Sequence, residues 1–168
     1  MEIIGVVAMD SKGGIGKDNS LPWPHCSEDL KMFKQLTKNS LVVMGRNTWY
    51  SLPFKLPNRT NVVVSRNLVE GADEVISFDG SIKDTLVNLA IEYNRDKIAV
   101  IGGKMLYEAL QYTVDTWYIT NFNGVYECDT FIDKKSLTNG FSMIQSVLLE
   151  DKVKLETYVS YSPATHKW

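Results

Sequence analysis

The sequence predicts an α/β fold: a single domain with a mixed, mainly parallel central β-sheet, helices on both faces and a C-terminal antiparallel hairpin. Two observations predict it. From residue 2 to about residue 111, short apolar runs rich in β-branched residues alternate with segments of helical pattern, as in parallel βαβ units. After Trp117 the pattern favours strands without intervening helices. A length of 168 residues suits one domain, spanning residues 1–168, with one well-formed core.

The first part of the chain predicts a central strand, a long loop and a helix. Residues 2–9 form a nearly continuous apolar run, as in a strand buried on both faces. Residues 10–24 hold three glycines and two prolines and predict a long loop. Ser27 can cap a helix that extends to Thr37 and has an acidic first turn.

The remaining elements follow from the same signals. Ser81 with Asp84 resembles a capping box that opens a helix, and Glu150-Asp151 is the predicted turn of the terminal hairpin. The other predicted strands span residues 41–44, 61–65, 75–78, 97–101, 141–149 and 152–162, and the other predicted helices span residues 46–52, 81–93 and 104–111.

Composition narrows the classes of function. Apolar residues make up 44% of the chain and charged residues 23%, which are ordinary globular values. The formal charge of −2, with Lys and Arg scattered, argues against a nucleic-acid partner, because phosphate neutralisation needs a basic face. No apolar run approaches the roughly 20 residues that span a bilayer, and the N-terminus lacks a secretory pattern. We therefore expect a cytoplasmic protein with no membrane partner.

Soft metal ligands are few. The chain has two cysteines, Cys26 and Cys128, and two histidines, His25 and His166. These are too few for a zinc site or a disulfide framework. We expect no metal, and we expect both cysteines to carry free thiols.

Two neighbouring acidic residues fall on different faces of the first predicted helix. Positions three and four residues apart share a helix face, so Asp29 lies above Met32 and Phe33, whereas Glu28 has more polar neighbours. A carboxylate on an apolar face is desolvated, which raises its pKa and makes it a candidate proton donor or ligand anchor. The alternative is a charge that stabilises the helix N-terminus.

The glycines of the long loop do not form a phosphate-binding motif. Ser11 stands where that motif needs its first glycine, and Asp18 stands where it needs a hydroxyl group for magnesium. Residues 10–24 are therefore either a mobile lid or an ordinary surface loop.

Three predicted strands end in residues suited to bind anions. Gly102-Gly103 follows the strand at residues 97–101, and the run Gly45-Arg46-Asn47-Thr48 and the pair Ser65-Arg66 follow two others. Backbone N–H groups at such turns and arginine side chains both bind phosphate. Taken singly, these residues suit tight packing or a solvated charge. Taken together, they predict one polyanionic ligand, such as a dinucleotide, across the carboxyl edge of the sheet.

Four segments share a further pattern in their order and spacing. They are residues 16–23, which include Leu-Pro-Trp; Asp29-Leu30 with Phe33-Lys34 and Thr37; residues 43–49 with Ser51-Leu52 and residues 56–59; and residues 100–103 with Tyr107. Residues 118–120 and 129–131 add weaker support. Together they resemble the dihydrofolate reductase family over nearly the whole chain. Compared with short bacterial members of the family, Gly13-Gly14 resembles an extra pair in the loop, and Cys128 replaces a small flexible residue.

The resemblance implies an enzyme, an NADPH-dependent oxidoreductase that reduces 7,8-dihydrofolate to 5,6,7,8-tetrahydrofolate and supports one-carbon and thymidylate metabolism. Hydride would pass from NADPH to C6, and a proton would reach N5. Dihydrofolate would be the small-molecule partner, and we expect a monomer.

The resemblance also implies roles for the substrate-binding residues. Asp29 would hold the pterin ring, supported by Thr120 and by a water near Trp23, and these three residues form the expected catalytic group. Arg59 would pair with the substrate's α-carboxylate. The expected substrate-binding residues are Ile4, Val6, Asp29, Leu30, Phe33, Leu52, Leu56, Arg59, Ile101, Tyr107 and Thr120.

By the same resemblance, the cofactor would lie across the strand ends. Arg46, Ser65 and Arg66 would bind its 2′-phosphate, which favours NADPH over NADH, and residues 10–24 would close over the nicotinamide and exclude water. The expected cofactor-binding residues are Val6, Ile15, Gly45, Arg46, Asn47, Thr48, Ser65, Arg66, Ile101, Gly102, Gly103, Lys104, Met105 and Leu106.

Two other functions stay open. A pyrimidine reductase of riboflavin synthesis would share the fold and the use of NADPH but should lack the combination of Asp29, Phe33 and Arg59. A non-catalytic folate-binding protein would keep the fold without turnover, and the presence of Asp29 and Trp23 argues against it. These residues favour dihydrofolate reduction.

Overall fold

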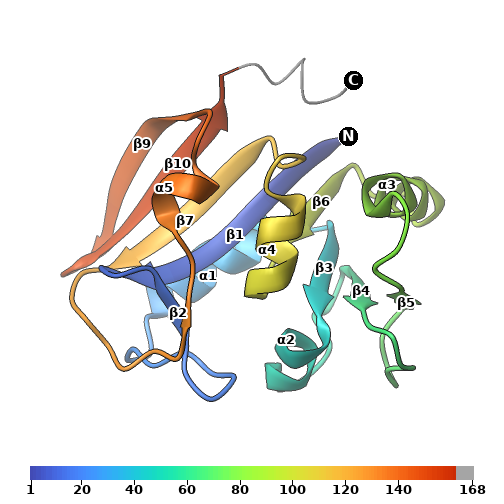
Figure 1. Cartoon of the computed structure of the whole chain (residues 1–168), viewed down its shortest axis with the longest axis horizontal. Helices are drawn as coiled ribbons and strands as arrows, with labels where there is room; N and C mark the ends of the chain where they lie inside the picture. Colours follow the sequence, from blue (N-terminus) through green and yellow to red (C-terminus); the bar gives the residue numbers. More distant parts are fainter. Residues whose placement is uncertain (162–168) are drawn as a thin grey trace.

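The structure is a computed structural model that describes residues 1–161 (Figure 1). His166, and Ser162 at the end of the last predicted strand, lie outside the described residues. The described elements are β1 (Glu2–Asp10), β2 (Gly14–Gly16), α1 (Ser27–Leu36), β3 (Leu41–Gly45), α2 (Arg46–Ser51), β4 (Thr60–Val64), β5 (Glu74–Ile76), α3 (Ile82–Glu92), β6 (Lys97–Val100), α4 (Lys104–Leu110), β7 (Thr116–Phe122), β8 (Thr130–Phe131), α5 (Lys134–Leu137), β9 (Phe141–Glu150) and β10 (Val153–Ser160).

Eight strands form one sheet in the order β5-β4-β3-β6-β1-β7-β10-β9. The pairs from β5 to β7 are all parallel, and β10 runs antiparallel to both β7 and β9. The predicted mixed, mainly parallel sheet with a terminal antiparallel hairpin is confirmed. The first apolar run of the chain, β1, lies between β6 and β7, in the interior of the sheet.

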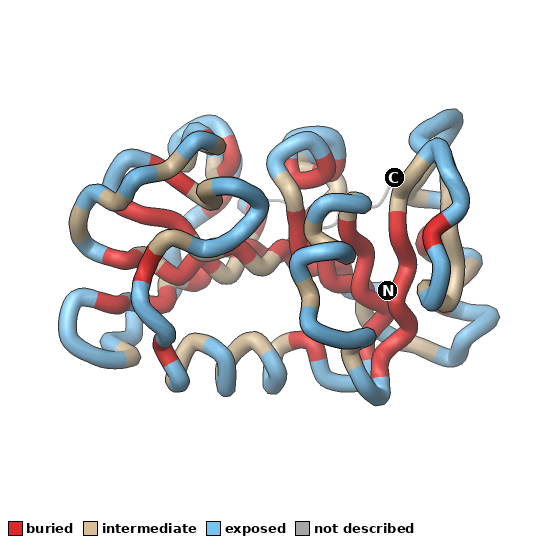
Figure 2. The backbone as a smooth tube through the Cα atoms, turned by 90° about the horizontal axis from the view of Figure 1, so that it is seen from below, coloured by how far each residue is buried: buried red, intermediate tan, exposed pale blue. Residues whose placement is uncertain are grey.

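Each face of the sheet is covered by its own helices. Successive residues of a strand point to opposite faces, so Ile3 and Val7 of β1 join a core cluster with α3, α4 and α5, while Ile4 joins a second cluster with α1 and α2. Figure 2 shows the buried strands running between helices whose outer sides are exposed. The two clusters confirm the predicted helices on both faces.

The two predicted helix caps differ in outcome. The Ser81 side chain accepts a hydrogen bond from the Asp84 backbone N–H at 3.4 Å, so the cap of α3 is confirmed. The cap predicted at Ser27 is wrong, because the N-cap of α1 is Cys26, and no side chain caps the helix there. The reason is that the Cys26 carbonyl already accepts from Leu30 N–H at 3.2 Å, which starts the helix one residue earlier.

Three short elements, β2, β8 and α5, were not predicted. Gly14–Gly16 forms β2 inside the expected loop and pairs with β8, and α5 interrupts the region expected to contain only strands. Glycine gives no strand signal of its own, so β2 depends on its distant partner. The helix α5 has four residues, too few to show helical periodicity, and is capped by the Asp133 side chain, which accepts from Lys135 N–H.

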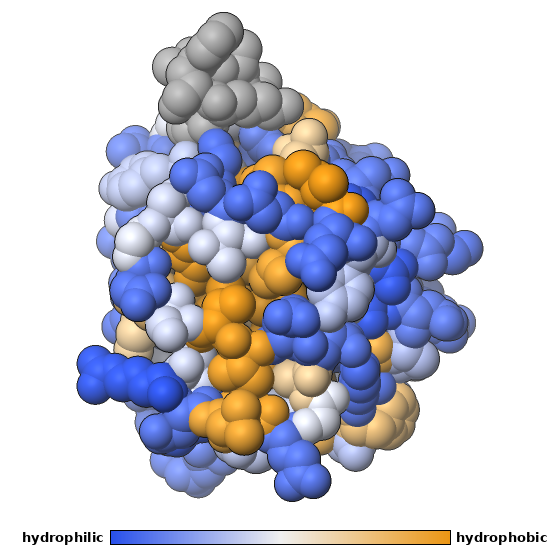
Figure 3. All heavy atoms as spheres, turned by 90° about the vertical axis from the view of Figure 1, so that its right-hand side faces the viewer, coloured by the Kyte–Doolittle hydropathy of each residue, from blue (hydrophilic) through white to orange (hydrophobic). Residues whose placement is uncertain are grey.

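The remaining observations concern the surface, membrane-spanning helices, metal ligands and cysteines. Figure 3 shows a strip of apolar atoms between hydrophilic surfaces on the side of the molecule that carries β5 and α3, where Leu68, Phe78 and Ile91 are exposed. Among residues 1–161, no helix is long and apolar enough to cross a membrane, and no group of three potential metal ligands occurs. Cys26 and Cys128 are both free.

Candidate active site

The acidic pair of α1 separates as its spacing predicts. Asp29 is partly buried, and its Oδ1 accepts a hydrogen bond of 2.6 Å from the Thr120 hydroxyl of β7. Burial raises the pKa of Asp29, and the hydrogen bond from Thr120 opposes this rise. Glu28, whose side chain is 46% exposed, instead pairs with Lys31. Asp29 therefore holds a proton more readily than an exposed aspartate does.

Trp23 lies near Asp29 on the same face of the sheet. It is buried and stacks on Phe122 of β7, with ring centroids 4.7 Å apart, and meets the edge of Tyr126 at 6.0 Å. Phe122 is two residues after Thr120, so both side chains point to one face of β7, about 7 Å apart along the strand. The predicted catalytic residues Asp29 and Trp23 thus contact Thr120 and Phe122, which lie on one face of β7.

Most of the predicted apolar substrate contacts share one cluster. Tyr118 of β7, which was not predicted, packs against the same cluster. Leu30 is the exception, because its side chain is 50% exposed and lies outside it. The predicted residues that gather here are Ile4, Val6, Phe33, Leu52, Leu56 and Ile101.

Arg59 is a buried cation beside this cluster. Only 9% of it is exposed; its Nε donates to the Pro57 carbonyl at 3.0 Å and its Nη1 donates to the Thr37 hydroxyl at 2.9 Å. Burial lowers the pKa of the guanidinium, which nevertheless stays charged. Within residues 1–161 it forms no ion pair with a carboxylate. A buried unpaired charge is unfavourable, so an anionic ligand would stabilise this arrangement.

The three predicted anion-binding strand ends are adjacent. The strands β4, β3 and β6 are parallel neighbours, so their carboxyl ends meet at one edge. Gly45 is the register partner of Val64, and Gly45 N–H donates to the Gly102 carbonyl at 2.8 Å. Gly102 has a φ of +133°, and an added Cβ would lie 3.1 Å from Thr48 Oγ1. Glycine therefore lets the two backbones approach closely there.

The predicted cofactor side chains differ in access. Arg46, Asn47 and Arg66 are exposed at this edge, and Thr48 and Ser65 are partly buried. At the start of α4, Lys104 and Met105 are exposed. Leu106 is 3% exposed and packs in the core, so any contact with a cofactor would use its backbone.

Tyr107 reaches the site from the opposite face. Its ring lies in the core beside Trp117, and its hydroxyl donates to the Val6 carbonyl at 2.7 Å. Burial raises the pKa of Tyr107 well above its usual value, so the phenol remains a proton donor. The backbone of Val6, a predicted cofactor-binding residue, is thus held in place by a side chain from the other face of the sheet.

The loop after β1 is anchored by a buried aspartate. Asp10 is 2% exposed; its Oδ1 accepts from Lys12 N–H at 2.9 Å and Gly14 N–H at 2.8 Å, and its Oδ2 accepts from Tyr126 N–H at 3.0 Å. Burial alone would raise the pKa of Asp10, but these backbone donors and the Cys128 thiol bring it below its usual value. The carboxylate therefore stays ionised and joins the loop to residues 126–128.

A second set of contacts holds the same loop further along. Asp129 Oδ2 accepts from Asp18 N–H at 2.9 Å, and Asp129 N–H donates to the Gly16 carbonyl at 2.9 Å. Cys128 fills the space beside Gly14, where an added Cβ would lie 2.4 Å from its sulfur. Gly14 and Cys128 are therefore sterically matched.

Comparison with known proteins agrees with this geometry. Residues 2–161 match the family model described as dihydrofolate reductase. The chain is 37% identical to dihydrofolate reductase type 9 of Escherichia coli over 165 residues, covering 94% of this chain and 92% of that protein. The chain belongs to the dihydrofolate reductase family. It is also 39% identical to the dihydrofolate reductase of Mycobacterium leprae over 140 residues, covering 79% and 76%, and 35% identical to that of Saccharomyces cerevisiae over 162 residues, covering 83% and 76%.

Membership in the dihydrofolate reductase family makes this protein an oxidoreductase and gives weight to residues that sequence reasoning did not assign to the site. Tyr118, Thr37, Asn61 and Asp10 all contact or support predicted site residues. Tyr118 could have been found, since it lies two positions before Thr120 in the region after Trp117 that favours strands. The contact of Thr37 with Arg59 spans 22 residues and that of Asp10 with Tyr126 spans 116, and no local pattern signals contacts of this range.

Proposed function

We propose that this chain catalyses the NADPH-dependent reduction of 7,8-dihydrofolate to 5,6,7,8-tetrahydrofolate and supports one-carbon and thymidylate metabolism. The observation that carries the proposal is a pair of charges of opposite sign at one apolar cluster. Asp29 is a partly buried carboxyl group with a raised pKa, and Arg59 is a buried guanidinium without a carboxylate partner among the described residues. Dihydrofolate has the matching groups, a basic pterin ring and a carboxylate tail.

The substrate would lie against the apolar cluster between these two charges. Asp29 would accept hydrogen bonds from a ring nitrogen and the 2-amino group of the pterin, and Thr120 would keep the carboxyl oriented. Arg59 would bind the α-carboxylate, because a guanidinium matches a carboxylate in bidentate geometry. Phe33 and Leu52 would contact the rings between them.

The residues at the sheet edge fit NADPH. The helices α2 and α4 begin directly after the glycines of two adjacent strand ends and have no side-chain cap, so their first backbone N–H groups would bind the pyrophosphate. Arg46, Ser65 and Arg66, which follow adjacent parallel strands, would bind the 2′-phosphate. When bound, NADPH supplies the hydride that is added to C6.

Within that complex, the residues of the chain handle the proton and exclude water. The raised pKa of Asp29 favours a proton at the pterin edge, so that N5 becomes protonated as C6 receives hydride. Solvent or a pterin tautomer can deliver this proton. The loop of residues 10–24, fixed at Asp10 and Asp129, would cover the reacting rings.

The test follows the loss of reduced-nicotinamide absorbance with purified protein, NADPH and dihydrofolate. We expect turnover by the parent and a roughly 10²–10⁴-fold lower kcat for Asp29→Asn, the range typical of general acid–base groups. Glu28→Gln is the matched control, because Glu28 is exposed and one residue away, and it should keep full activity. Tight binding of folate and NADPH without oxidation would instead support a folate-binding protein, and full activity of Asp29→Asn would refute the role of Asp29.

The choice of cofactor has its own test. Arg66→Gln should weaken binding of NADPH more than binding of NADH, because only NADPH carries the 2′-phosphate. Equal weakening, measured by fluorescence titration with both cofactors, would contradict the phosphate assignment.

We also propose a cytoplasmic monomer. All residues proposed to touch substrate and cofactor come from one chain, which supports the monomer. The free thiols of Cys26 and Cys128 suit a reducing compartment, which supports the cytoplasm. Light scattering during gel filtration would reveal a second copy if one is needed.

A further inference from the structure

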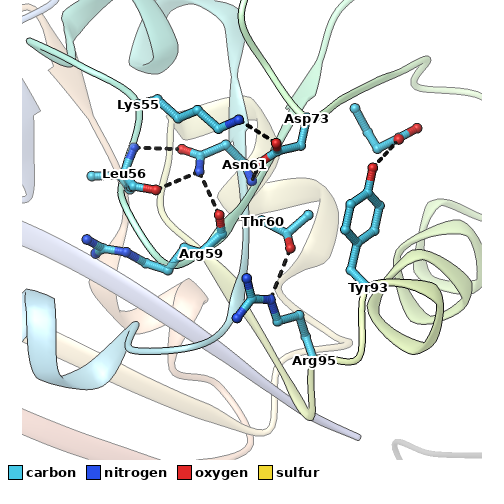
Figure 4. Close-up of polar contacts among 9 residues, drawn as sticks. Lys55, Leu56, Arg59, Thr60, Asn61, Asp73, Tyr93 and Arg95 are labelled. Atoms are coloured by element: carbon cyan, nitrogen blue, oxygen red, sulfur yellow. Dashed lines mark hydrogen bonds and ion pairs between the residues drawn. The ribbon is translucent and has the colours of Figure 1, made fainter.

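Asn61, in β4, uses its buried side chain to bind the loop that carries Arg59. It is 0% exposed. Its Oδ1 accepts from Leu56 N–H at 3.0 Å, and its Nδ2 donates to the Leu56 carbonyl at 2.9 Å and to the Arg59 carbonyl at 3.1 Å. Figure 4 shows these bonds converging on the Asn61 amide. Both amide hydrogens and the oxygen are thus used to fix residues 56–61.

Asp73 holds the same loop from the segment between β4 and β5. Its Oδ2 accepts from Asn61 N–H at 2.6 Å, and its other oxygen pairs with Lys55 (Figure 4). Asp73 therefore joins both ends of the loop, the lysine at its start and the asparagine at its end.

Arg95 holds the opposite side of this loop. Its Nε donates to the Thr60 hydroxyl at 3.0 Å and its Nη1 donates to the Asn58 carbonyl at 3.3 Å. Asn58 has a φ of +60°, a left-handed conformation in which asparagine is among the more tolerant residues. The backbone on both sides of Arg59 is therefore fixed by side chains.

The Arg59 side chain itself points away from this network. In Figure 4 its guanidinium extends to the far side of the loop from the Asn61 amide. There it donates to the Pro57 carbonyl and the Thr37 hydroxyl. These two contacts leave other guanidinium N–H groups for a ligand, and their direction depends on where the loop places the Cα of Arg59.

We propose that Asn61 and Asp73 are positioning residues for substrate selection. By fixing residues 56–61 they hold the Arg59 guanidinium at the distance from Asp29 that suits a dihydropterin with a carboxylate tail. They thereby determine the preference for such substrates over dihydropterins without a tail. The inference rests on the proposed function, because it takes Arg59 as the group that binds the substrate's carboxylate.

The experiment compares two substrates, dihydrofolate and a 7,8-dihydropterin that lacks the aminobenzoyl-glutamate tail. Asn61→Ala should raise KM for dihydrofolate about tenfold, since it removes the bonds that fix the loop, and should leave kcat within about twofold. Asp73→Ala should act in the same direction. For the tail-less dihydropterin, kcat/KM should stay unchanged in both variants, because that substrate does not use Arg59.

Conservative and control variants distinguish a positioning role of Asn61 and Asp73 from a general effect on the stability of the protein. Asp73→Asn keeps an oxygen that can accept from Asn61 N–H, so it should restore most of the parent's KM. Asn88→Ala and Asp79→Ala, exposed residues of the same types, should match the parent with both substrates. If Asn61→Ala does not fold, Asp73→Ala decides the question, because the Asp73 side chain is partly exposed and easier to remove.

Arg59→Leu distinguishes failure of this inference from failure of the proposed function. If Arg59→Leu raises KM for dihydrofolate alone while the Asn61 and Asp73 variants do not, the positioning role is wrong and the substrate assignment stands. Equal losses on both substrates in the Asn61 and Asp73 variants would also overturn the positioning role. If Arg59→Leu does not discriminate between the substrates, the assignment of Arg59 in the proposed function is itself wrong.

Discussion

Asp10, at the end of β1, and Asp29, in α1, are two aspartates withdrawn from solvent, and their environments shift their pKa values in opposite directions. Asp10 accepts three backbone N–H bonds, and its pKa lies below the usual value despite burial. Asp29 accepts one bond, from the Thr120 hydroxyl, and burial raises its pKa. Burial therefore does not by itself make a carboxyl group reactive. The number of donors that remain aimed at the ionised form decides the outcome.

Among substitutions that test this comparison, the largest effect on stability is expected at Asp10. Asp10→Ala leaves three backbone N–H groups without their acceptor, which should lower the free energy of unfolding by about 3 kcal/mol. Urea denaturation at neutral pH measures this loss. Asp79→Ala, at an exposed aspartate, should change stability little. A loss as small as that of the control would mean that solvent replaces Asp10 without penalty.

The pH dependence of this loss has a definite sign. Because folding lowers the pKa of Asp10 below 3.8, its ionised form stabilises the protein above about pH 4. That contribution disappears as the pH falls through the folded pKa. The difference in stability between the parent and the isosteric Asp10→Asn should therefore shrink below pH 3.8. A difference that grows in acid would contradict the assignment.

A smaller loss of stability should follow from adding a side chain at Gly14, beside Asp10. Gly14→Ala would place a Cβ 2.4 Å from the Cys128 sulfur and 3.0 Å from Asp10 Oδ1. Such overpacking typically costs about 1–3 kcal/mol. Cys128→Gly in the same chain should restore much of the loss, which a double-mutant cycle measures. Gly16→Ala is the control in the same strand, because its added Cβ meets only the Ser20 carbonyl, at an ordinary 3.5 Å.

The effect on stability should be smaller and of opposite sign at Asp29. Folding raises the pKa of Asp29 above 3.8, so its ionised form destabilises the protein as the pH rises past that value. Asp29→Asn removes this penalty and keeps an acceptor for Thr120. The variant should therefore melt slightly higher than the parent at neutral pH while losing turnover. A lower melting temperature would show that the carboxylate is stabilising.

The smallest change is expected from removing the one donor to Asp29. The Thr120 hydrogen bond favours the ionised form, so Thr120→Val should raise the pKa of Asp29 further. The alkaline limb of the kcat profile should then move to higher pH. Movement to lower pH would indicate that Thr120 stabilises the protonated form. Thr116→Val is the control. Thr116 lies on the same face of β7 as Thr120, four residues earlier, and its replacement should leave the pH profile of kcat unchanged.

The sequence predicted those features of the site that depend on local pattern. Helical spacing placed Asp29 on the apolar face of α1, and strand ends marked by Gly45 and Gly102 proved to be neighbours at one sheet edge. The contact of Asp10 with Tyr126 and that of Asp29 with Thr120 could not be predicted in the same way, because the partners lie 116 and 91 residues away. Contacts of that range depend on strand order, and strand order has no local signal.

The same limit explains one error in the fold. The strand β2 is made of glycines and isoleucine and exists through pairing with the distant strand β8. The two helix caps are both local signals. The cap at Ser81 was predicted correctly, but the cap predicted at Ser27 was wrong because the Cys26 carbonyl starts α1 one residue earlier.

The position of β1 has a consequence for synthesis of the protein. This strand is translated well before its two neighbours in the sheet, β6 and β7, which begin only at Lys97 and Thr116. A nascent chain on the ribosome must therefore carry an apolar segment without its partners until Phe122 has emerged. Contacts of such long range slow folding and expose unpaired strand edges in the meantime. Chaperone dependence during translation should accordingly be concentrated on the stage before Phe122 has emerged.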